Sequence, residues 1–271
     1  FSAMQVGALR ITIASSVLLP FGLYNFRKIK SLKQFIFLTM VGVFGNFIPA
    51  FLFTYAETGL SSGYAGMLNS FTPIFTLLIG FFVFKVRLSS VQIIGVFIGF
   101  IGIVLLMLAG SDFKSSGTWM QIAAIVLATF MYGISLNTIK HTLQQFSAIE
   151  ITSLAFSIVF IPSLIANYIF GTVSTLQTNP FALEGLTAIS ILAIFGTALA
   201  NIVFNRVITY TSTLFASGVT YFIPIVAVLI GFSFGERITF FQLLAMVVVL
   251  IGVFIANYWR LILDKFAKIK K

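Results

Sequence analysis

The sequence predicts an all-α membrane protein with ten helices in two related halves. Three observations carry this prediction: the composition, the spacing of the apolar runs and an internal repeat. Of the 271 residues, 59% are hydrophobic and 8% are charged, and the mean hydropathy is +1.12. Soluble domains do not have this composition, so we expect lipid rather than water to surround most of the chain.

The elements follow from the apolar runs, which are bounded by charged and turn residues. A helix needs about 20 apolar residues to cross the hydrocarbon core of a bilayer. Nine spans are expected, at residues 4–24, 35–57, 63–84, 91–109, 119–139, 148–170, 186–208, 215–235 and 240–259. The connections between them are short, so neighbouring helices are expected to be antiparallel with no soluble domain between them.

The content of chemical groups excludes several classes of site. The chain has no cysteine, which rules out disulfides and thiolate metal sites, and we expect neither a metal nor a cofactor. A net charge of +10 would suggest a nucleic-acid partner in a soluble protein. Here the basic residues lie in short gaps between apolar runs, so they are interpreted as a topology signal and no nucleic-acid partner is expected.

The basic residues are distributed unequally over alternate loops. One set of loops and the C-terminal tail carry twelve Lys and Arg residues, whereas the other set carries only Lys114 and Arg237. Lys and Arg in short loops stay on the cytoplasmic side. This predicts a multi-pass protein of the plasma (inner) membrane, in contact with membrane lipids, whose C-terminus and basic tail (residues 260–271) are cytoplasmic.

An internal repeat relates two parts of the chain. Residues 45–81 match residues 196–232 without a gap, with 12 identities in 37 positions. After a slip of one residue the match continues, with Gln92 opposite Gln242 and Gly102 opposite Gly252. The repeat therefore covers at least three consecutive spans.

The repeat also extends upstream, because residues 1–5 resemble residues 146–150 and each segment opens a span. In the second half one more span, 119–139, precedes this point. An equivalent helix is therefore expected before Phe1, which makes nine spans of an original ten. The expected units are a first repeat at 1–117 lacking its first helix, a second repeat at 118–259 and the tail at 260–271.

Each unit would contain five helices, which is an odd number. The second unit must then enter the membrane upside down relative to the first, as an inverted-topology repeat. Transporters with inverted repeats bind their substrates near the middle of the membrane, between the repeats.

At this point the sequence resembles the EamA family of the drug/metabolite transporter superfamily. The resemblance rests on the stretch from Ala216 to Pro224, on residues 235–239 that follow as Gly-Glu-Arg-Ile-Thr, and on Gln242. The first repeat departs from the usual Gly-Glu pair with Lys85-Val86-Arg87. The resemblance implies ten helices and a transporter that exports amino acids, other metabolites or drugs.

Polar residues form stripes on four of the expected spans, two from each repeat. Residues three or four apart share a face of a helix, so these stripes predict a central substrate cavity. Both Pro73 and Pro224 remove a backbone hydrogen bond and are expected to kink their helices. The candidate cavity residues are Arg10, Asn46, Tyr55, Asn69, Thr72, Tyr132, Asn201, Thr220 and Tyr221.

Arg10 is the most informative of these candidates because it lies inside a span, where an unpaired guanidinium is costly. Two partners are open at this stage. The first is Glu57 at the end of the next span, which would make a structural ion pair. The second is a carboxylate on the substrate.

Other functions compete with a transporter of small molecules. An intramembrane enzyme needs paired acids or a Ser-His pair at membrane depth, but the acids lie away from mid-membrane and the one histidine, His141, is expected in a loop. No enzyme is therefore expected. A lipid-linked sugar flippase and a non-transporting membrane subunit stay open as alternatives, and so does a homodimer. Without a buried acid, we expect facilitated or weakly coupled export.

Overall fold

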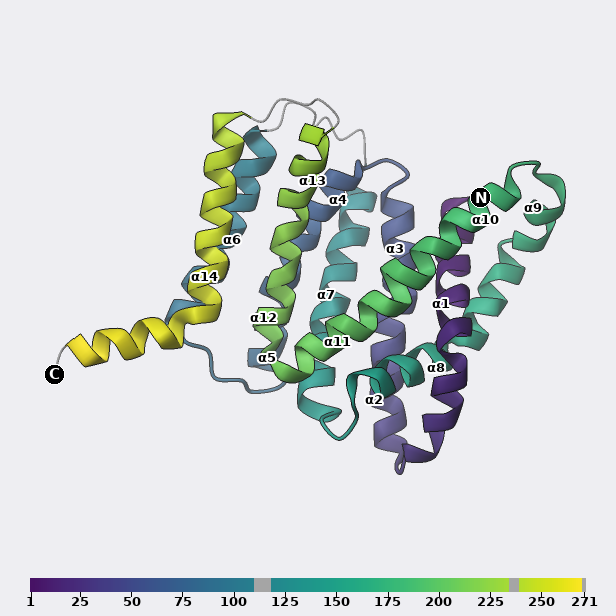
Figure 1. Cartoon of the computed structure of the whole chain (residues 1–271), viewed down its shortest axis with the longest axis horizontal. Helices are drawn as coiled ribbons and strands as arrows, with labels where there is room; N and C mark the ends of the chain where they lie inside the picture. Colours follow the sequence, from purple (N-terminus) through teal and green to yellow (C-terminus); the bar gives the residue numbers. More distant parts are fainter. Residues whose placement is uncertain (110–117, 234–238, 270–271) are drawn as a thin grey trace.

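The computed structural model describes residues 1–109, 118–233 and 239–269, and the described residues form helices and connecting turns without any β-strand (Figure 1). Within these ranges, the side chains at 62, 63, 107, 227, 228, 230–233 and 258–269 lie outside the description. Seven helical segments are long and apolar enough to cross a membrane. Two shorter apolar helices, Ser90–Leu106 and Thr213–Val226, occupy the other two expected spans. The chain is therefore an all-α, multi-pass membrane protein.

The first half of the chain contains the following elements: α1 (Ala3–Asn25), η1 (Phe26–Lys28), α2 (Leu32–Gly42), η2 (Val43–Phe47), α3 (Ile48–Ala56), α4 (Ser62–Leu68), η3 (Asn69–Phe71), α5 (Thr72–Phe82) and α6 (Ser90–Ala109). The second half contains α7 (Trp119–Thr142), α8 (Ala148–Ile169), α9 (Thr172–Thr178), α10 (Ala182–Ile191), η4 (Leu192–Leu199), α11 (Ala200–Tyr210), α12 (Thr213–Gly218), η5 (Val219–Tyr221), α13 (Phe222–Ser233) and α14 (Phe240–Ile269).

Two details differ from the expected elements. A short helix, α9, lies between the sixth and seventh expected spans, where the sequence analysis placed a plain loop. His141 was expected in a loop, but it belongs to the last turn of α7, and its ring stacks on Phe84 with centroids 5.2 Å apart. The helix continues this far because apolar Ile139 and Leu143 on either side are buried in the core. The tail was expected at residues 260–271, and its side chains lie outside the described residues.

The repeated segments contain the same irregularities in the same order. In the first half, α2 and α3 are joined by the π-helical turn η2, and α4 and α5 by the 3-10 turn η3. In the second half, the π segment η4 and the 3-10 turn η5 fall at the aligned positions. Figure 1 shows that α4 and α5 run in the opposite direction to α12 and α13.

Capping interactions between a Ser or Thr and a Gln or Glu three residues later fix four helix starts that are placed alike in the two halves. Ser2 and Gln5 begin α1, and Ser147 and Glu150 begin α8. In a capping box the side chains of the two residues satisfy each other's backbone N–H groups. The Gln92 side chain accepts from Ser89 N at the start of α6 (3.1 Å), and that of Gln242 accepts from Thr239 N at the start of α14 (2.8 Å).

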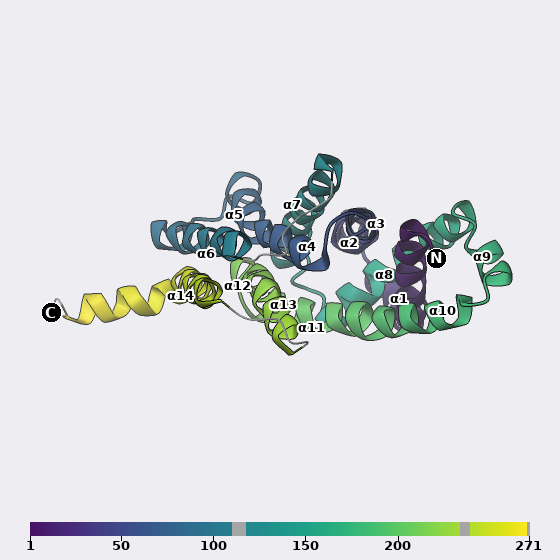
Figure 2. The same ribbon diagram turned by 90° about the horizontal axis from the view of Figure 1, so that it is seen from above.

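Two helix pairs flank the centre of the molecule (Figure 2). At one end α6 packs along α14, and at the other α1 packs along α8. The α6–α14 pair is close because glycines face each other: a Cβ on Gly252 would lie 2.2 Å from the backbone nitrogen of Gly99. Small residues allow this approach, which favours helix association in lipid.

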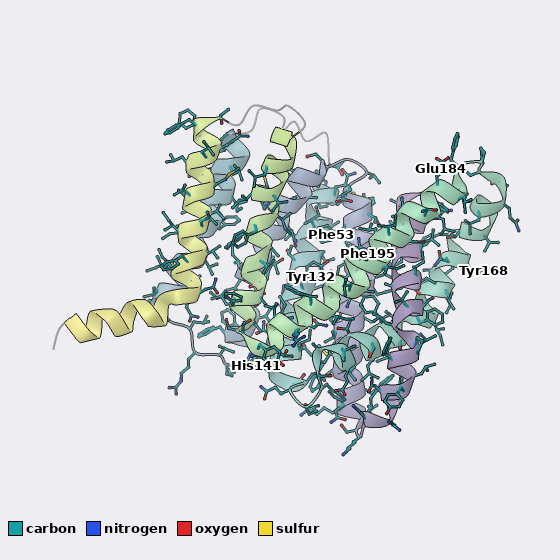
Figure 3. All side chains as sticks on the ribbon, in the orientation of Figure 1. Phe53, Tyr132, His141, Tyr168, Glu184 and Phe195 are labelled. Carbon is teal, nitrogen blue, oxygen red and sulfur yellow. The ribbon has the colours of Figure 1, made fainter. Side chains whose placement is uncertain are left out.

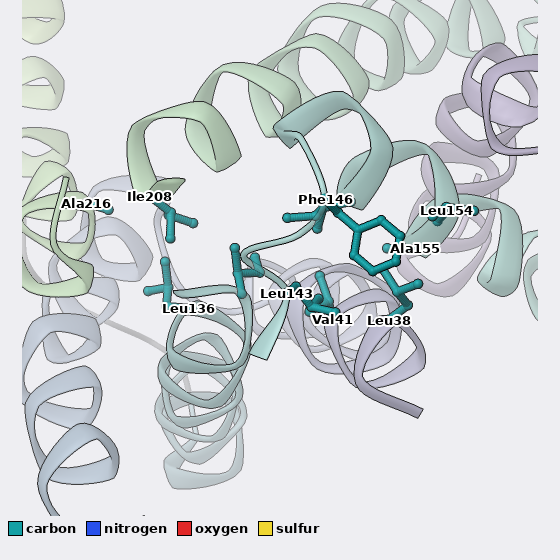
Figure 4. Close-up of a cluster of buried hydrophobic side chains, with 11 residues drawn as sticks. Leu38, Val41, Leu136, Leu143, Phe146, Leu154, Ala155, Ile208 and Ala216 are labelled. Carbon is teal, nitrogen blue, oxygen red and sulfur yellow. The ribbon is translucent and has the colours of Figure 1, made fainter. Parts of the chain in front are cut away.

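The largest apolar cluster among the described residues joins α2, α7, α8, α11 and α12 (Figure 4). Leu38, Leu143, Ile151 and Leu154 in this cluster are fully buried. Lys28 also forms an ion pair with Glu150 between η1 and α8. These contacts hold the first half against the second half.

Candidate functional site

A cavity of about 680 Å³ lies between the two halves of the chain. Its walls come from α1, α2, η2, η3, α5 and α7 together with η4, α11, η5 and α13. Ligand pockets for small molecules commonly have volumes of about 300–1,000 Å³. The polar residues that line it are Arg10, Asn46, Asn69, Thr72, Tyr132, Ser135, Thr197, Asn201, Asn205 and Thr220.

The two π-helical segments contribute aligned residues to this cavity. Asn46 lies in η2, and its amide nitrogen donates to Val41 O at 3.4 Å, five residues earlier. Thr197 lies at the aligned position in η4, and its hydroxyl donates to Leu192 O at 3.3 Å, again five residues earlier. The extra residue of a π turn changes which side chains face inward, and such turns are frequent at functional sites.

The two 3-10 turns precede the prolines that were expected to kink their helices. Pro73 is the second residue of α5, which follows η3, and Pro224 lies in the first turn of α13, which follows η5. Because proline has no N–H, the carbonyl four residues earlier loses its donor. At the first site this carbonyl belongs to Asn69, and the Thr72 hydroxyl donates to it at 2.7 Å. Thr72 therefore repairs the break and lines the cavity as well.

Helix α7 lines the cavity with one face. Its lining residues are three or four positions apart, which places them on one face of the helix: Tyr132, Ser135, Leu136 and Ile139. Figure 3 labels Tyr132 and Phe195, both cavity-lining residues, near the centre of the molecule, whereas His141 lies below them and Glu184 lies toward the upper right end. The Tyr132 ring stacks on Phe53 with centroids 6.0 Å apart.

Arg10 reaches the cavity from α1. Its Nε atom is buried and has no hydrogen-bond partner among the described residues. The expected structural pair with Glu57 is not formed: within the described ranges the one ion pair is that of Lys28 with Glu150. Glu57 instead ends α3, where it is exposed.

Seven of the nine candidate residues line the cavity. Arg10, Asn46, Asn69, Thr72, Tyr132, Asn201 and Thr220 are brought together there. Tyr55 and Tyr221 are not among the lining residues. Tyr55 packs instead against a cluster that includes Ala56, Leu60 and Ile125.

Tyr221 was expected to face the cavity, but the structure places it in the core beside α6. It is 1% exposed, and its hydroxyl donates to Val96 O at 3.0 Å. Its ring fills the space that the missing side chain of Gly99 leaves, since a Cβ there would lie 2.7 Å from Tyr221 Cε2. The preceding residue, Thr220, faces the cavity, and one step along a helix turns a side chain by about 100°.

Several cavity residues were not among the candidates. Ser135 could have been found from its spacing of three residues after Tyr132. Gly45, Phe195 and Gly196 line the cavity because they lie in the π segments, which have no composition signal.

A second hollow, of about 810 Å³, lies between the ends of α7 and α11 and the start of α8. It is larger than the cavity between the halves and includes Lys140 and Arg206. None of the candidate residues lines it. The cavity between the halves is therefore the site to which the repeat and the polar stripes point.

The two halves of the chain each match one known family model. The model of the EamA-like transporter family matches twice, at residues 1–108 and 119–258. The chain belongs to the EamA-like transporter family. As a member of this family it is a homologue of membrane transporters.

Relatives of this EamA-like chain have names of the same kind. It is 23% identical over 267 residues to the uncharacterized transporter YyaM of Bacillus subtilis, with 95% of this chain and 85% of the relative covered. It is 26% identical over 255 residues to the uncharacterized inner membrane transporter YedA of Escherichia coli, with 92% and 80% covered. A protein of known crystal structure superposes with a TM-score of 0.66 at 14% identity, covering 94% of this chain and 88% of that one, which shows the fold alone.

Proposed function

We propose that this chain exports small polar metabolites such as amino acids, or drug-like compounds, through the cavity by alternating access. The observation that carries the proposal is the cavity itself, whose polar wall is built from both halves at aligned positions. Asn46 and Thr197 form one aligned pair, and Asn69 and Thr220 form another. An enzyme is not proposed, because acids and histidine are absent from the residues lining the cavity.

The architecture proposed with this function is that of two inverted repeats, at residues 1–117 and 118–259. The opposite course of the aligned segments α4–α5 and α12–α13 supports it (Figure 1). Rocking of one repeat against the other around a fixed site is the usual form of alternating access in such folds. Arg10, Asn46, Asn69, Thr72, Tyr132, Asn201 and Thr220 are the proposed substrate contacts.

The proposed location is the plasma (inner) membrane with the C-terminus in the cytoplasm. The twelve basic residues on one side against two on the other support this orientation. A tag after Lys271 should be accessible only in permeabilised cells. Labelling of the tag in intact cells would contradict the orientation.

Reconstitution tests the transport function directly. The full chain in liposomes loaded with labelled amino acids should release them faster than protein-free liposomes. The double variant Asn69→Ala/Thr220→Ala should release them at least about tenfold more slowly than the wild type, because one polar contact is removed from each half. Efflux equal to that of protein-free liposomes for every compound would refute the proposal. Since the lining has no acid, a pH gradient should change the rate little.

A further inference from the structure

Arg10 differs from Arg27 and Arg206 in its burial and in having no contacting partner among the described residues. The Arg27 guanidinium lies 4.0 Å from the Tyr24 ring centroid, and the Arg206 guanidinium lies 5.8 Å from that of Tyr210. Both residues are exposed. Arg10 is half-buried within α1 and has neither an ion pair nor a hydrogen bond to a described residue. Glu57 is close enough for the charge of Arg10 to act on its carboxyl group, but the two residues form no ion pair. A guanidinium at membrane depth is costly without a direct partner, so the absence of one calls for an explanation.

A partner for Arg10 can come from within the cavity, because Arg10 lines its wall. Among the residues that line it, Arg10 alone is charged, and the other polar groups are amides and hydroxyls. Several of these already donate to the protein: Asn201 to Thr197 O at 2.9 Å and Asn205 to the Thr152 hydroxyl at 2.9 Å. The guanidinium is the charged donor at the cavity wall.

The sign of this charge selects the ligand. A planar guanidinium binds a carboxylate through two parallel hydrogen bonds, and such charge-assisted bonds are about twice as strong as neutral ones. A cationic amine would meet a like charge with no acid in the lining to compensate for it. The ligand should therefore offer a carboxylate, with neutral polar groups beside it for the amides and hydroxyls.

We infer that Arg10 holds the carboxylate of the transported compound, so that the substrates are small zwitterionic or anionic carboxylates rather than cationic amines or drugs. This inference rests on the proposed transport function. Of the two possible partners of Arg10, this inference selects the carboxylate of the substrate as the counter-ion and not Glu57.

The test compares compounds that differ only in the carboxylate. Liposomes containing the full chain are loaded with a pool of common amino acids or with the corresponding amino-acid amides, and efflux is followed by mass spectrometry against protein-free liposomes. We expect the wild type to move the acids roughly tenfold faster than the amides. Because this comparison needs no mutation, it stays valid even where a variant fails to fold.

Variants then locate the effect. Arg10→Gln should slow the acids roughly tenfold and leave the amides unchanged, and Arg10→Lys should retain part of the rate, because an ammonium keeps the charge but loses the paired geometry. Arg27→Gln is the matched control, since Arg27 lies in η1 away from the cavity and should transport as the wild type does. Thermal unfolding in detergent checks that each variant is folded.

Each outcome decides a different point. If the wild type moves acids and amides at equal rates, or if folded Arg10→Gln moves the acids like the wild type, the carboxylate role is overturned while transport stands. If neither pool leaves the liposomes, the transport function itself fails and this inference fails with it.

Discussion

The two halves of the chain share a backbone pattern but differ in how aligned positions are filled. Asn69 and Thr220 are aligned, and both are polar and line the cavity. The next positions, Ser70 and Tyr221, are aligned and buried, yet one is the smallest hydroxyl side chain and the other a large aromatic. At these positions the side chain that faces the cavity is polar in both halves, although Thr72 faces the cavity at the position aligned with Ile223. The protein-facing positions match only their own neighbours.

The strongest test of this comparison is the close crossing of α6 and α14. A Cβ at Gly252 would lie 2.2 Å from Gly99 N, and one at Gly102 would lie 2.7 Å from Val249 N. Because these neighbours are backbone atoms that cannot move aside, Gly102→Val and Gly252→Val should each cost more than about 3 kcal/mol of stability. Thermal unfolding in detergent measures this cost. A melting temperature close to that of the wild type for either variant would show that α6 and α14 do not depend equally on their close contact.

The aligned pair Ser70 and Tyr221 should respond unequally. Tyr221→Ala removes a fully buried ring and should cost about 3 kcal/mol. Tyr221→Phe loses only the bond to Val96 O and should cost about 1 kcal/mol. Ser70→Ala should change stability by less than about 0.5 kcal/mol, because the Ser70 hydroxyl has no partner among the described residues. Equal losses for Tyr221→Ala and Ser70→Ala would show that the two positions are packed alike.

The aligned glycines of the π segments should also differ. A Cβ on Gly45 would lie 2.4 Å from the Ser135 hydroxyl, whereas one on Gly196 would lie 3.0 Å from the flexible end of Leu192. Gly45→Ala should therefore cost about 1–2 kcal/mol, and Gly196→Ala should be neutral or slightly stabilising, because alanine favours a helix over glycine. The double variant Gly45→Ala/Ser135→Ala should recover much of the loss. Without such recovery, the contact with Ser135 is not the cause.

The smallest expected effect is on transport alone. Asn69→Ala and Thr220→Ala should each slow efflux by about five- to tenfold, since each removes one polar contact from the cavity wall. Their melting temperatures should stay near that of the wild type, because Thr72 still donates to Asn69 O in the first variant. If only one of the two variants loses transport, the polar contacts to the substrate come from one half and not from both.

The sequence was sufficient for the helices and for much of the cavity wall. Apolar runs predict spans from composition, and the alignment of residues 45–81 with 196–232 brings Asn69 and Thr220 to equivalent positions. The sequence does not predict that Tyr221 is buried in the core. Its burial depends on how α6 packs beside it, and the spacing of residues along the chain does not contain this information. The π turns were not predicted either, since one extra residue per turn leaves no mark on composition. The absence of an Arg10–Glu57 pair depends on distances between helices, which no spacing along the chain contains.

The capping interactions at the helix starts have a consequence for how two such halves can diverge. Ser2 with Gln5 and Ser147 with Glu150 act within a single turn, and so do Ser89 with Gln92 and Thr239 with Gln242. A device confined to one turn works whichever way up its helix enters the bilayer and whatever lies beside it. A duplicated unit therefore keeps its helix starts through local interactions alone. The side chains that pack against the other copy can then change until the two copies fit together.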